Sequence, residues 1–267
     1  MEQVSGVSCN VEGPVARITL TAATRQNRLD WPAISAMHEF VREVIESETA
    51  RVLVIDAEGK DFCAGDCWPE MGEWPRKYTH RKPGGSHGSP PLPLIDLLGD
   101  LRSIGIPAIA VLQGEVSDAG LDLACHCDIR LAADNAVFQD KRVESARFSA
   151  TGITYVLPRL VGLSNAARIL MFGERIDAIE AARIGLVYKT VAADRLQKDA
   201  QALIEAVSGM ATRSFGLVKQ QVTEQLDMNY RTALMHSMAV RQTNIFEDRE
   251  EGQRAFIEKR PPQYTGR

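Results

Sequence analysis

Residues 106–130 read IPAIAVLQGEVSDAGLDLACHCDIR, and this stretch decides the fold. The run 106–112 is apolar and partly β-branched and is followed by Gly114, which is typical of a buried strand that ends in a tight turn. Ala119-Gly120 then opens a second apolar segment with small residues, which predicts a helix whose first amides could meet a ligand oxygen. Another strand is expected at 128–132. This order of strand, turn, buried helix and strand indicates a layered α/β protein.

The composition indicates one sizeable folded body. Of the 267 residues, 45% are hydrophobic, so the chain can bury a large core as one domain or as one domain with an appendage. The net charge of −4 provides no general positive field for nucleic acid. No apolar run has the length of a membrane span, and the N-terminus lacks the basic and apolar regions of a leader peptide. We therefore expect a cytoplasmic protein that binds neither nucleic acid nor membranes.

The cysteines predict neither disulfides nor a metal site. Their number is odd and the chain otherwise resembles an intracellular protein, which argues against a disulfide framework. Neither Cys63 with Cys67 nor Cys125 with Cys127 has the CxxC spacing of zinc ligands. We expect these four residues and Cys9 to be ordinary thiols, and no metal to be bound.

Strand and helix signals divide the chain into two parts. Strands are expected at 15–20, 51–56, 107–112 and 128–132. From about residue 165 the pattern becomes helical, at 164–173, 177–185, 193–210, 214–225 and 230–246, so the C-terminal third is expected to be all helical. No GxGxxG or Walker A motif follows any expected strand, and the two common nucleotide-binding α/β classes therefore lack their motif here.

The segment 72–93 is rich in Pro, Gly, Ser, His and basic residues. Such a composition does not pack a core, so it predicts a loop. The loop either borders a ligand pocket or is a solvated linker. Trp68 and Trp74 lie at its start, where they either wall a substrate pocket or simply pack against the protein.

Several separate blocks resemble the crotonase (enoyl-CoA hydratase/isomerase) superfamily. These blocks are 106–130, FCAGD at 62–66, LPRLVG at 157–162, GERIDA at 173–178, AARIGLV at 181–187 and FIEKR at 256–260, in the order of the family. The resemblance implies an α/β fold, the crotonase (ClpP-like) spiral of ββα repeats, followed by a helical C-terminal trimerisation region. It implies a spiral core at 1–200, a helical region at 201–267, and a homotrimer or a dimer of trimers.

The same resemblance implies where catalysis occurs. Crotonase relatives hold the thioester oxygen of an acyl-CoA as an enolate between two backbone amides, which align here with Asp66 and Ala119. Hydratases of the family also use two glutamates, and those positions are Asp122 and Arg142. Asp122 retains a carboxylate, but an arginine transfers no proton near neutral pH. Ordinary two-glutamate hydration is therefore not expected.

Acidic residues near Arg142 leave alternatives open. Asp140, in Phe138-Gln139-Asp140, resembles a catalytic residue of crotonase-fold β-diketone hydrolases, but an aspartate here could instead cap a following helix. Glu144 is expected to pair with Arg142 or Arg147 rather than to enter the pocket.

Two further side chains beside the expected site have alternative roles. The side chain of Asp66 is expected to point to solvent or to pair with a base, because an inward carboxylate would oppose an enolate. His126 follows Asp122 by one helical turn, so it either bonds Asp122 or is a packed core histidine.

For the coenzyme A moiety, the resemblance implies contacts with the first oxyanion loop, which includes Ala64, and with scattered basic residues. The candidates are Arg25, Arg28 and Lys259, and the C-terminal lysine of relatives can come from a neighbouring subunit. Coenzyme A would enter as part of the substrate, and no other cofactor is expected.

Three functions remain open on the sequence. The leading hypothesis is an enzyme of fatty acid metabolism, a lyase or isomerase that acts on an acyl-CoA or related thioester through a stabilised enolate. Asp140 motivates a C–C hydrolase of β-diketones. Arg142 motivates a binding protein for acyl-CoA that catalyses no reaction.

Overall fold

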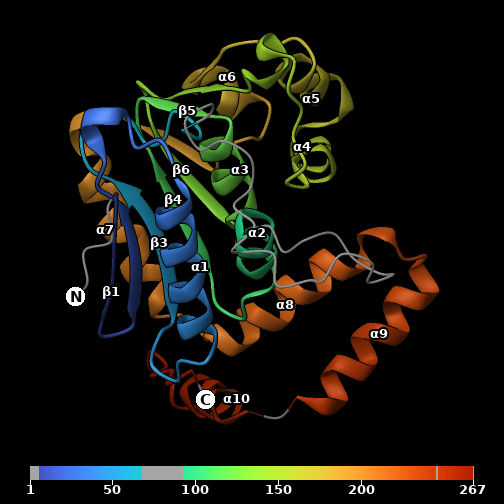
Figure 1. Ribbon diagram of the computed structural model, residues 1–267. Coiled ribbons are helices and arrows are strands. Elements are labelled where there is room, and N and C mark those ends of the chain that lie inside the picture. Colours follow the sequence, from blue (N-terminus) through green and yellow to red (C-terminus); the bar gives the residue numbers. More distant parts are fainter. Residues whose placement is uncertain (1–5, 68–92, 245, 267) are drawn as a thin grey trace, which may run out of the picture.

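A six-stranded sheet forms the centre of the molecule (Figure 1). The computed structural model describes residues 6–67, 93–244 and 246–266. The strand order is β1-β2-β3-β4-β6-β9, in which only β1 and β2 pair antiparallel. The strands are β1 (Val7–Glu12), β2 (Val15–Leu20), β3 (Val52–Ala57), β4 (Ala108–Leu112), β6 (Ile129–Ala133) and β9 (Lys189–Val191).

A second, smaller sheet contains β5 (Glu115–Ser117), β7 (Val137–Gln139) and β8 (Ile176–Asp177). Along the chain, β4 is followed by β5 and then helix α3 (Ala119–His126), while β6 is followed by β7 and then the short helix η3 (Arg142–Ser145). Each repeat therefore contributes one strand to each sheet. The parallel pairing of β5 with β7 stacks the two repeats, which confirms the expected ββα units.

Helices cover both faces of the large sheet. On one face lie α1 (Trp31–Ile45), α2 (Pro93–Ser103) and α3, and on the other lies α7 (Leu196–Ser208) (Figure 1). Successive residues of β3 pack on opposite faces of the sheet. Leu53 packs in the core shared with α1 to α3, and Val54 packs in the core shared with α7. Because both faces are covered, all six residues of β3 are buried.

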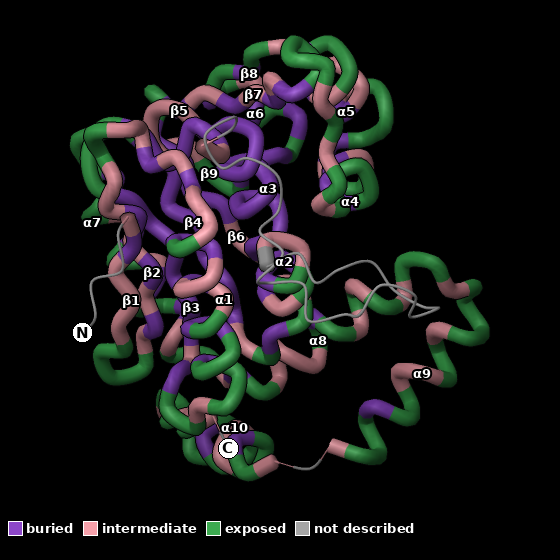
Figure 2. Tube along the Cα trace, viewed as in Figure 1, coloured by how far each residue is buried: buried purple, intermediate pink, exposed green. Residues whose placement is uncertain are grey.

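The remaining helices of the described residues are α4 to α6 and α8 to α10, with three further short helices. They are η1 (Ala23–Arg25), α4 (Ile153–Val161), α5 (Leu163–Leu170), α6 (Ala178–Arg183), η4 (Ala193–Arg195), α8 (Thr212–Glu224), η5 (Gln225–Asp227), α9 (Tyr230–Thr243) and α10 (Glu247–Glu258). Helix α9 stands away from the body, and its surface is mostly exposed (Figure 2).

The expectation of an all-helical C-terminal third is wrong. Strands β8 and β9 both lie after residue 165. They contain two and three residues, too few to establish a periodicity in the sequence, and they form because β7 and β6 supply their hydrogen-bonding partners.

The boundary expected at residue 200 falls inside α7. Residues on both sides of it, Leu196 and Ile204, pack in the same apolar layer beneath the sheet. The whole of α7 therefore belongs structurally with the sheet.

A search of the described helices for a membrane span finds none of sufficient length and apolar character.

Candidate active site

Two segments of the chain meet beside the N-terminus of α3. The amide of Cys63 donates to the carbonyl of Glu115 at 3.0 Å, and the amide of Ser117 donates to the carbonyl of Cys63 at 2.9 Å. A Cβ atom on Gly120 would lie 2.4 Å from the Cys63 carbonyl oxygen, so only glycine allows this approach. Segment 62–66 is thereby held directly against the start of α3.

The candidate amides of Asp66 and Ala119 lie on these two facing segments. Ala119 is the first residue of α3, where helical amides have no carbonyl acceptor within the helix. A helix N-terminus also favours negative charge because the peptide dipoles are aligned. The structure thus brings together the two segments that the sequence predicted.

Asp122, Arg142 and Asp140 form a buried cluster, which we call the inner cluster. Arg142 Nη2 lies 2.8 Å from Asp122 Oδ2, and Arg142 Nε lies 3.4 Å from Asp140 Oδ1. The exposed fractions of the three side chains are 1% for Asp122, 6% for Arg142 and 3% for Asp140. Arg142 is therefore surrounded by carboxylates of its own chain.

The pKa of Asp122 is raised to about 6, because complete burial disfavours the charged carboxylate. The neighbouring Arg142 opposes this shift without cancelling it. Asp122 Oδ2 accepts the hydrogen bond from Arg142, whereas Oδ1 has no hydrogen-bond partner within the described part of the chain. A carboxyl group with such a pKa exchanges its proton readily near neutral pH.

Asp66, Arg147 and Asp118 form a second cluster, which we call the outer cluster. Arg147 Nη1 lies 3.1 Å and 3.3 Å from the two carboxylate oxygens of Asp66, and Nη2 lies 3.6 Å from Asp118 Oδ2. The pairing of Asp66 with a base, one of the two orientations expected, is confirmed. Asp118 is buried directly before α3, and its Oδ1 accepts the amide of Lys141 at 2.7 Å.

The structure also shows the partners of two neighbouring acidic residues, Asp140 and Glu144. Asp140 Oδ1 accepts the amide of Arg142, the first residue of η3, at 3.0 Å, while the cap position of η3 is Lys141 and not Asp140. Glu144 pairs with neither arginine: both bind aspartates, and Glu144 instead accepts a hydrogen bond from Gln139 at 3.4 Å. The expected ion pair of Glu144 is therefore wrong.

His126 is a packed core histidine. Its Nδ1 lies 2.7 Å from the backbone carbonyl of Asp122, not from the carboxylate, which makes Nδ1 the donor in this bond. Burial lowers the pKa of His126, so the neutral ring is favoured.

The four candidate residues for coenzyme A lie in different places. Arg28 Nη1 donates to the carbonyl of Asp66 at 3.3 Å, and the amide of Ala64 donates to Gln26 at 3.0 Å, so both residues lie at the first oxyanion segment. Arg25 is paired with Asp30 at 2.8 Å. Lys259 follows α10, at the opposite end of the molecule from α3 (Figure 1). A single chain does not bring Lys259 to the other three.

Some predictions lie outside the described residues. Trp68, Trp74 and nearly all of the expected loop at 72–93 belong to the range 68–92. All five cysteines lie among the described residues, and Cys63, Cys125 and Cys127 are buried. Among the described residues there is no group of three His, Cys, Asp or Glu side chains arranged to hold a metal ion.

An apolar cavity of about 430 Å³ opens beside the inner cluster. Arg142 and Asp140 line one part of it, and α4 and α5 supply Pro158, Leu163 and Leu170. The cavity was not predicted from the sequence, although all the residues that line it lie within 140–171, where η3, α4 and α5 follow one another. Its position next to Arg142 provides space for an apolar group near Asp122.

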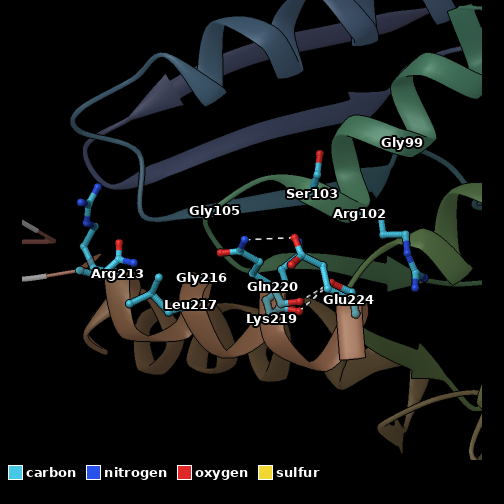
Figure 3. A pocket seen from close by; sticks show the side chains of 12 residues that line it. Gly99, Arg102, Ser103, Gly105, Arg213, Gly216, Leu217, Lys219, Gln220 and Glu224 are labelled. Atoms are coloured by element: carbon cyan, nitrogen blue, oxygen red, sulfur yellow. Dashed lines mark hydrogen bonds between the residues drawn. The ribbon is translucent and has the colours of Figure 1, made fainter. Parts of the chain in front are cut away.

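A second cavity of about 570 Å³ lies between α2 and α8 (Figure 3). Its buried cation, Lys219, donates to the carbonyl of Leu101 at 3.0 Å and pairs with Asp128 at 2.8 Å. These bonds hold α8 on the body of the protein. Because none of the residues predicted for the site lines this cavity, we do not place the active site there.

The sequence did not identify Asp118 as a residue of the site, and it did not predict the role of Arg147. Asp118 carried a usable signal, because a polar residue directly before a helix of small and apolar residues is typical of an N-terminal position. For Arg147 no such signal existed, since its partner Asp66 is 81 residues away in the chain.

Comparison with known proteins identifies relatives over nearly the whole chain. Residues 10–267 match the family model described as "Enoyl-CoA hydratase/isomerase". A "Probable enoyl-CoA hydratase" of Mycobacterium leprae is 34% identical over an alignment that covers 63% of this chain and 66% of that protein. "Probable enoyl-CoA hydratase 2, mitochondrial" of Arabidopsis thaliana is 27% identical over 94% of this chain and 82% of its own length. The crystal structure of an enoyl-CoA hydratase from Bacillus anthracis has a TM-score of 0.87 and 26% identity, and covers 98% of this chain and 100% of that chain.

Proposed function

The chain belongs to the enoyl-CoA hydratase/isomerase family, the crotonase superfamily expected from its sequence blocks, and from this premise we propose that it converts an acyl-CoA thioester through an enolate. We further propose that the enzyme is not an ordinary two-glutamate hydratase. The observation that carries this proposal is the inner cluster, in which Arg142 occupies the second acid position and binds Asp122.

In the proposed reaction, the amides of Asp66 and Ala119 bind the thioester oxygen. Loss of the proton at the α-carbon would place negative charge on this oxygen, and two fixed amide donors stabilise that charge. One such donor typically contributes about 3 to 4 kcal/mol to lowering the barrier. The close packing of segment 62–66 against α3 supports this role, since fixed donors need no rearrangement during the reaction.

Asp122 is the proposed proton carrier. Its pKa of about 6 leaves much of the carboxylate ionised at neutral pH, so Oδ1 can accept the α-proton and later return it. Addition of water across a double bond needs a second acid or base to handle the water molecule. Arg142 cannot supply one, because a guanidinium stays protonated. Proton removal and return at carbon are therefore favoured over hydration.

The apolar cavity beside Arg142 is the proposed site of the acyl group. Its walls, which include Pro158, Leu163 and Leu170, suit hydrocarbon rather than charge. Arg142 does not select a carboxylated acyl group in this proposal, because Asp122 and Asp140 already neutralise it.

We also propose that the protein acts as a homotrimer or a dimer of trimers. Helix α9 buries little of its own surface and exposes Tyr230, Leu234, Met235 and Met238. A contiguous apolar surface of this kind is typical of subunit interfaces. Sedimentation at micromolar concentration should give a trimer or larger species, and a monomer would contradict the proposal.

Two assays test the proposed reaction. In deuterated water, the protein should exchange the α-protons of a saturated acyl-CoA, such as butyryl-CoA, for deuterium. Crotonyl-CoA should be hydrated slowly or not at all, since a missing acid–base group typically lowers a rate by about 10² to 10⁴. Rapid hydration of crotonyl-CoA by the unaltered protein would show that another group replaces the second glutamate, and the assignment of Arg142 would be wrong.

A further inference from the structure

Two carboxylates lie next to the proposed oxyanion hole, which is an unfavourable arrangement for stabilising an anion. Asp66 carries one of the two proposed amides, and Asp118 directly precedes Ala119, which carries the other. A Cβ atom on Gly65 would lie 3.1 Å from the side chain of Asp118, so the two acidic segments are in close contact. If both carboxylates were ionised and unpaired, each would oppose negative charge on the thioester oxygen.

Arg147 lies between these two carboxylates. Its Nη1 is within 3.3 Å of both oxygens of Asp66, and its Nη2 is 3.6 Å from Asp118 Oδ2. The third nitrogen, Nε, donates to Ser145 Oγ at 3.2 Å. All three nitrogens of the guanidinium therefore have partners in the protein, which fixes its plane.

The backbone also fixes Arg147. Its amide donates to the carbonyl of Arg142 at 2.8 Å, and Ala146 takes a left-handed conformation, with φ of 56°, to close this turn. Asp118 also has a positive φ, of 48°, with ψ of −113°, although it is not glycine. A buried aspartate in a disfavoured conformation persists only where its surroundings hold it, and Arg147 and the Lys141 amide are its partners here.

Burial sets the strength of this interaction. The side chain of Asp118 is 6% exposed, and those of Asp66 and Arg147 are 25% and 23% exposed. Partial burial reduces screening by water, so the positive charge acts on the adjacent site more strongly than a surface arginine would.

We propose that Arg147 is a positioning residue of the oxyanion hole: its guanidinium neutralises Asp66 and Asp118 and holds the two amide-bearing segments in register for the enolate. This inference rests on the proposed function, because it requires that an enolate forms between the amides of Asp66 and Ala119. It assigns to Arg147 an electrostatic effect on the bound anion, in addition to any effect on folding.

Acetoacetyl-CoA is a suitable probe. Loss of its C2 proton to solvent gives an enolate that absorbs in the near ultraviolet, so a pH titration of the complex reports how well the site stabilises the anion. In Arg147→Gln, the apparent pKa of bound acetoacetyl-CoA should rise by about one unit or more, which corresponds to about tenfold less enolate at a given pH. Adding Asp66→Asn to this variant should reverse a large part of the shift, whereas loss of structure alone would not be reversed.

Arg17→Gln is the matched control. Arg17 forms a similarly half-buried ion pair with Asp56, on β2 and β3, and this variant should leave the apparent pKa of the probe unchanged. Should Arg147→Gln fail to fold, Asp66→Asn alone tests the same idea, since removing a negative charge beside the hole should lower the apparent pKa of the probe.

Two outcomes separate the possible failures. An unchanged probe pKa in Arg147→Gln, or in Asp66→Asn where that variant replaces it, with enolate formed normally by the parent, overturns the role of Arg147 and leaves the proposed function intact. No binding or enolisation of acetoacetyl-CoA by the parent overturns the proposed function, and the role of Arg147 with it.

Discussion

The inner and outer clusters have the same composition, one arginine between two aspartates, but different surroundings. In the inner cluster, the side chains of Asp122, Arg142 and Asp140 are at most 6% exposed. In the outer cluster, Arg147 and Asp66 are 23% and 25% exposed. Asp118 of the outer cluster is 6% exposed, as buried as the inner side chains, but water screens Arg147 and Asp66 and can replace a partner lost there, whereas all three inner side chains are enclosed by protein. Burial, rather than residue type, therefore decides which cluster stabilises the fold and which tunes the site.

The largest expected effect is the loss of catalysis in Asp122→Asn, a substitution within the inner cluster. The amide keeps the size of the side chain and an oxygen that can accept from Arg142, but it cannot carry a proton. We expect α-proton exchange of butyryl-CoA to fall by a factor of about 10² to 10⁴. Circular dichroism serves as the control for folding. Equal exchange rates in Asp122→Asn and the parent would exclude Asp122 as the proton carrier.

The next effect concerns stability. Arg142→Gln would leave two carboxylates buried without their cation, and we expect the free energy of unfolding at neutral pH to fall by about 3 to 5 kcal/mol. Urea titration measures this change. The double variant Asp122→Asn with Arg142→Gln should lose less than the sum of the single variants, because it removes one of the unpaired charges. Strict additivity would indicate that the two residues do not interact.

The pH dependence of stability distinguishes the clusters further. The pKa of Asp122 rises from an ordinary value of 3.8 to about 6 in the folded protein, so folding favours its protonated form. The contribution of Asp122 to the free energy of unfolding is complete below about pH 4, and it is lost as the pH rises through about 6. The loss amounts to about 3 kcal/mol at one pKa unit per 1.36 kcal/mol. Asp122→Asn should remove this part of the pH profile, and an unchanged profile would contradict the raised pKa.

The smallest expected effect on stability is that of Arg147→Gln. Because Arg147 and Asp66 are partly solvated, and the buried Asp118 keeps the hydrogen bond from the Lys141 amide, the free energy of unfolding should fall by only about 0 to 1 kcal/mol, several times less than for Arg142→Gln. The same urea titration provides the comparison. A loss as large as that of Arg142→Gln would mean that the difference in burial does not determine how much each cluster stabilises the fold.

The central strands could be predicted because apolar runs mark them directly. The expected strand at 15–20 coincides with β2, the one at 107–112 begins one residue before β4, and those at 51–56 and 128–132 are each shifted by one residue from β3 and β6. Strands β3 and β4 are buried at every residue between helices on both faces, so nearly every one of their residues is apolar. Strands β8 and β9 could not be predicted in the same way, because two or three residues form a strand only when a neighbouring strand is present.

For the site, the sequence alone determined which backbone segments meet and which residue types they carry. Gly120 and Gly65 permit close approach, and the family blocks imply that Asp66, Ala119, Asp122 and Arg142 belong to one site. The pairing of charges was decided only by the tertiary structure. Arg147 had one plausible partner nearby in Glu144, yet it binds Asp66 and Asp118, from segments far away in the chain. The physical reason is that an ion pair depends on distance and burial in space, and neither can be deduced from spacing along the chain.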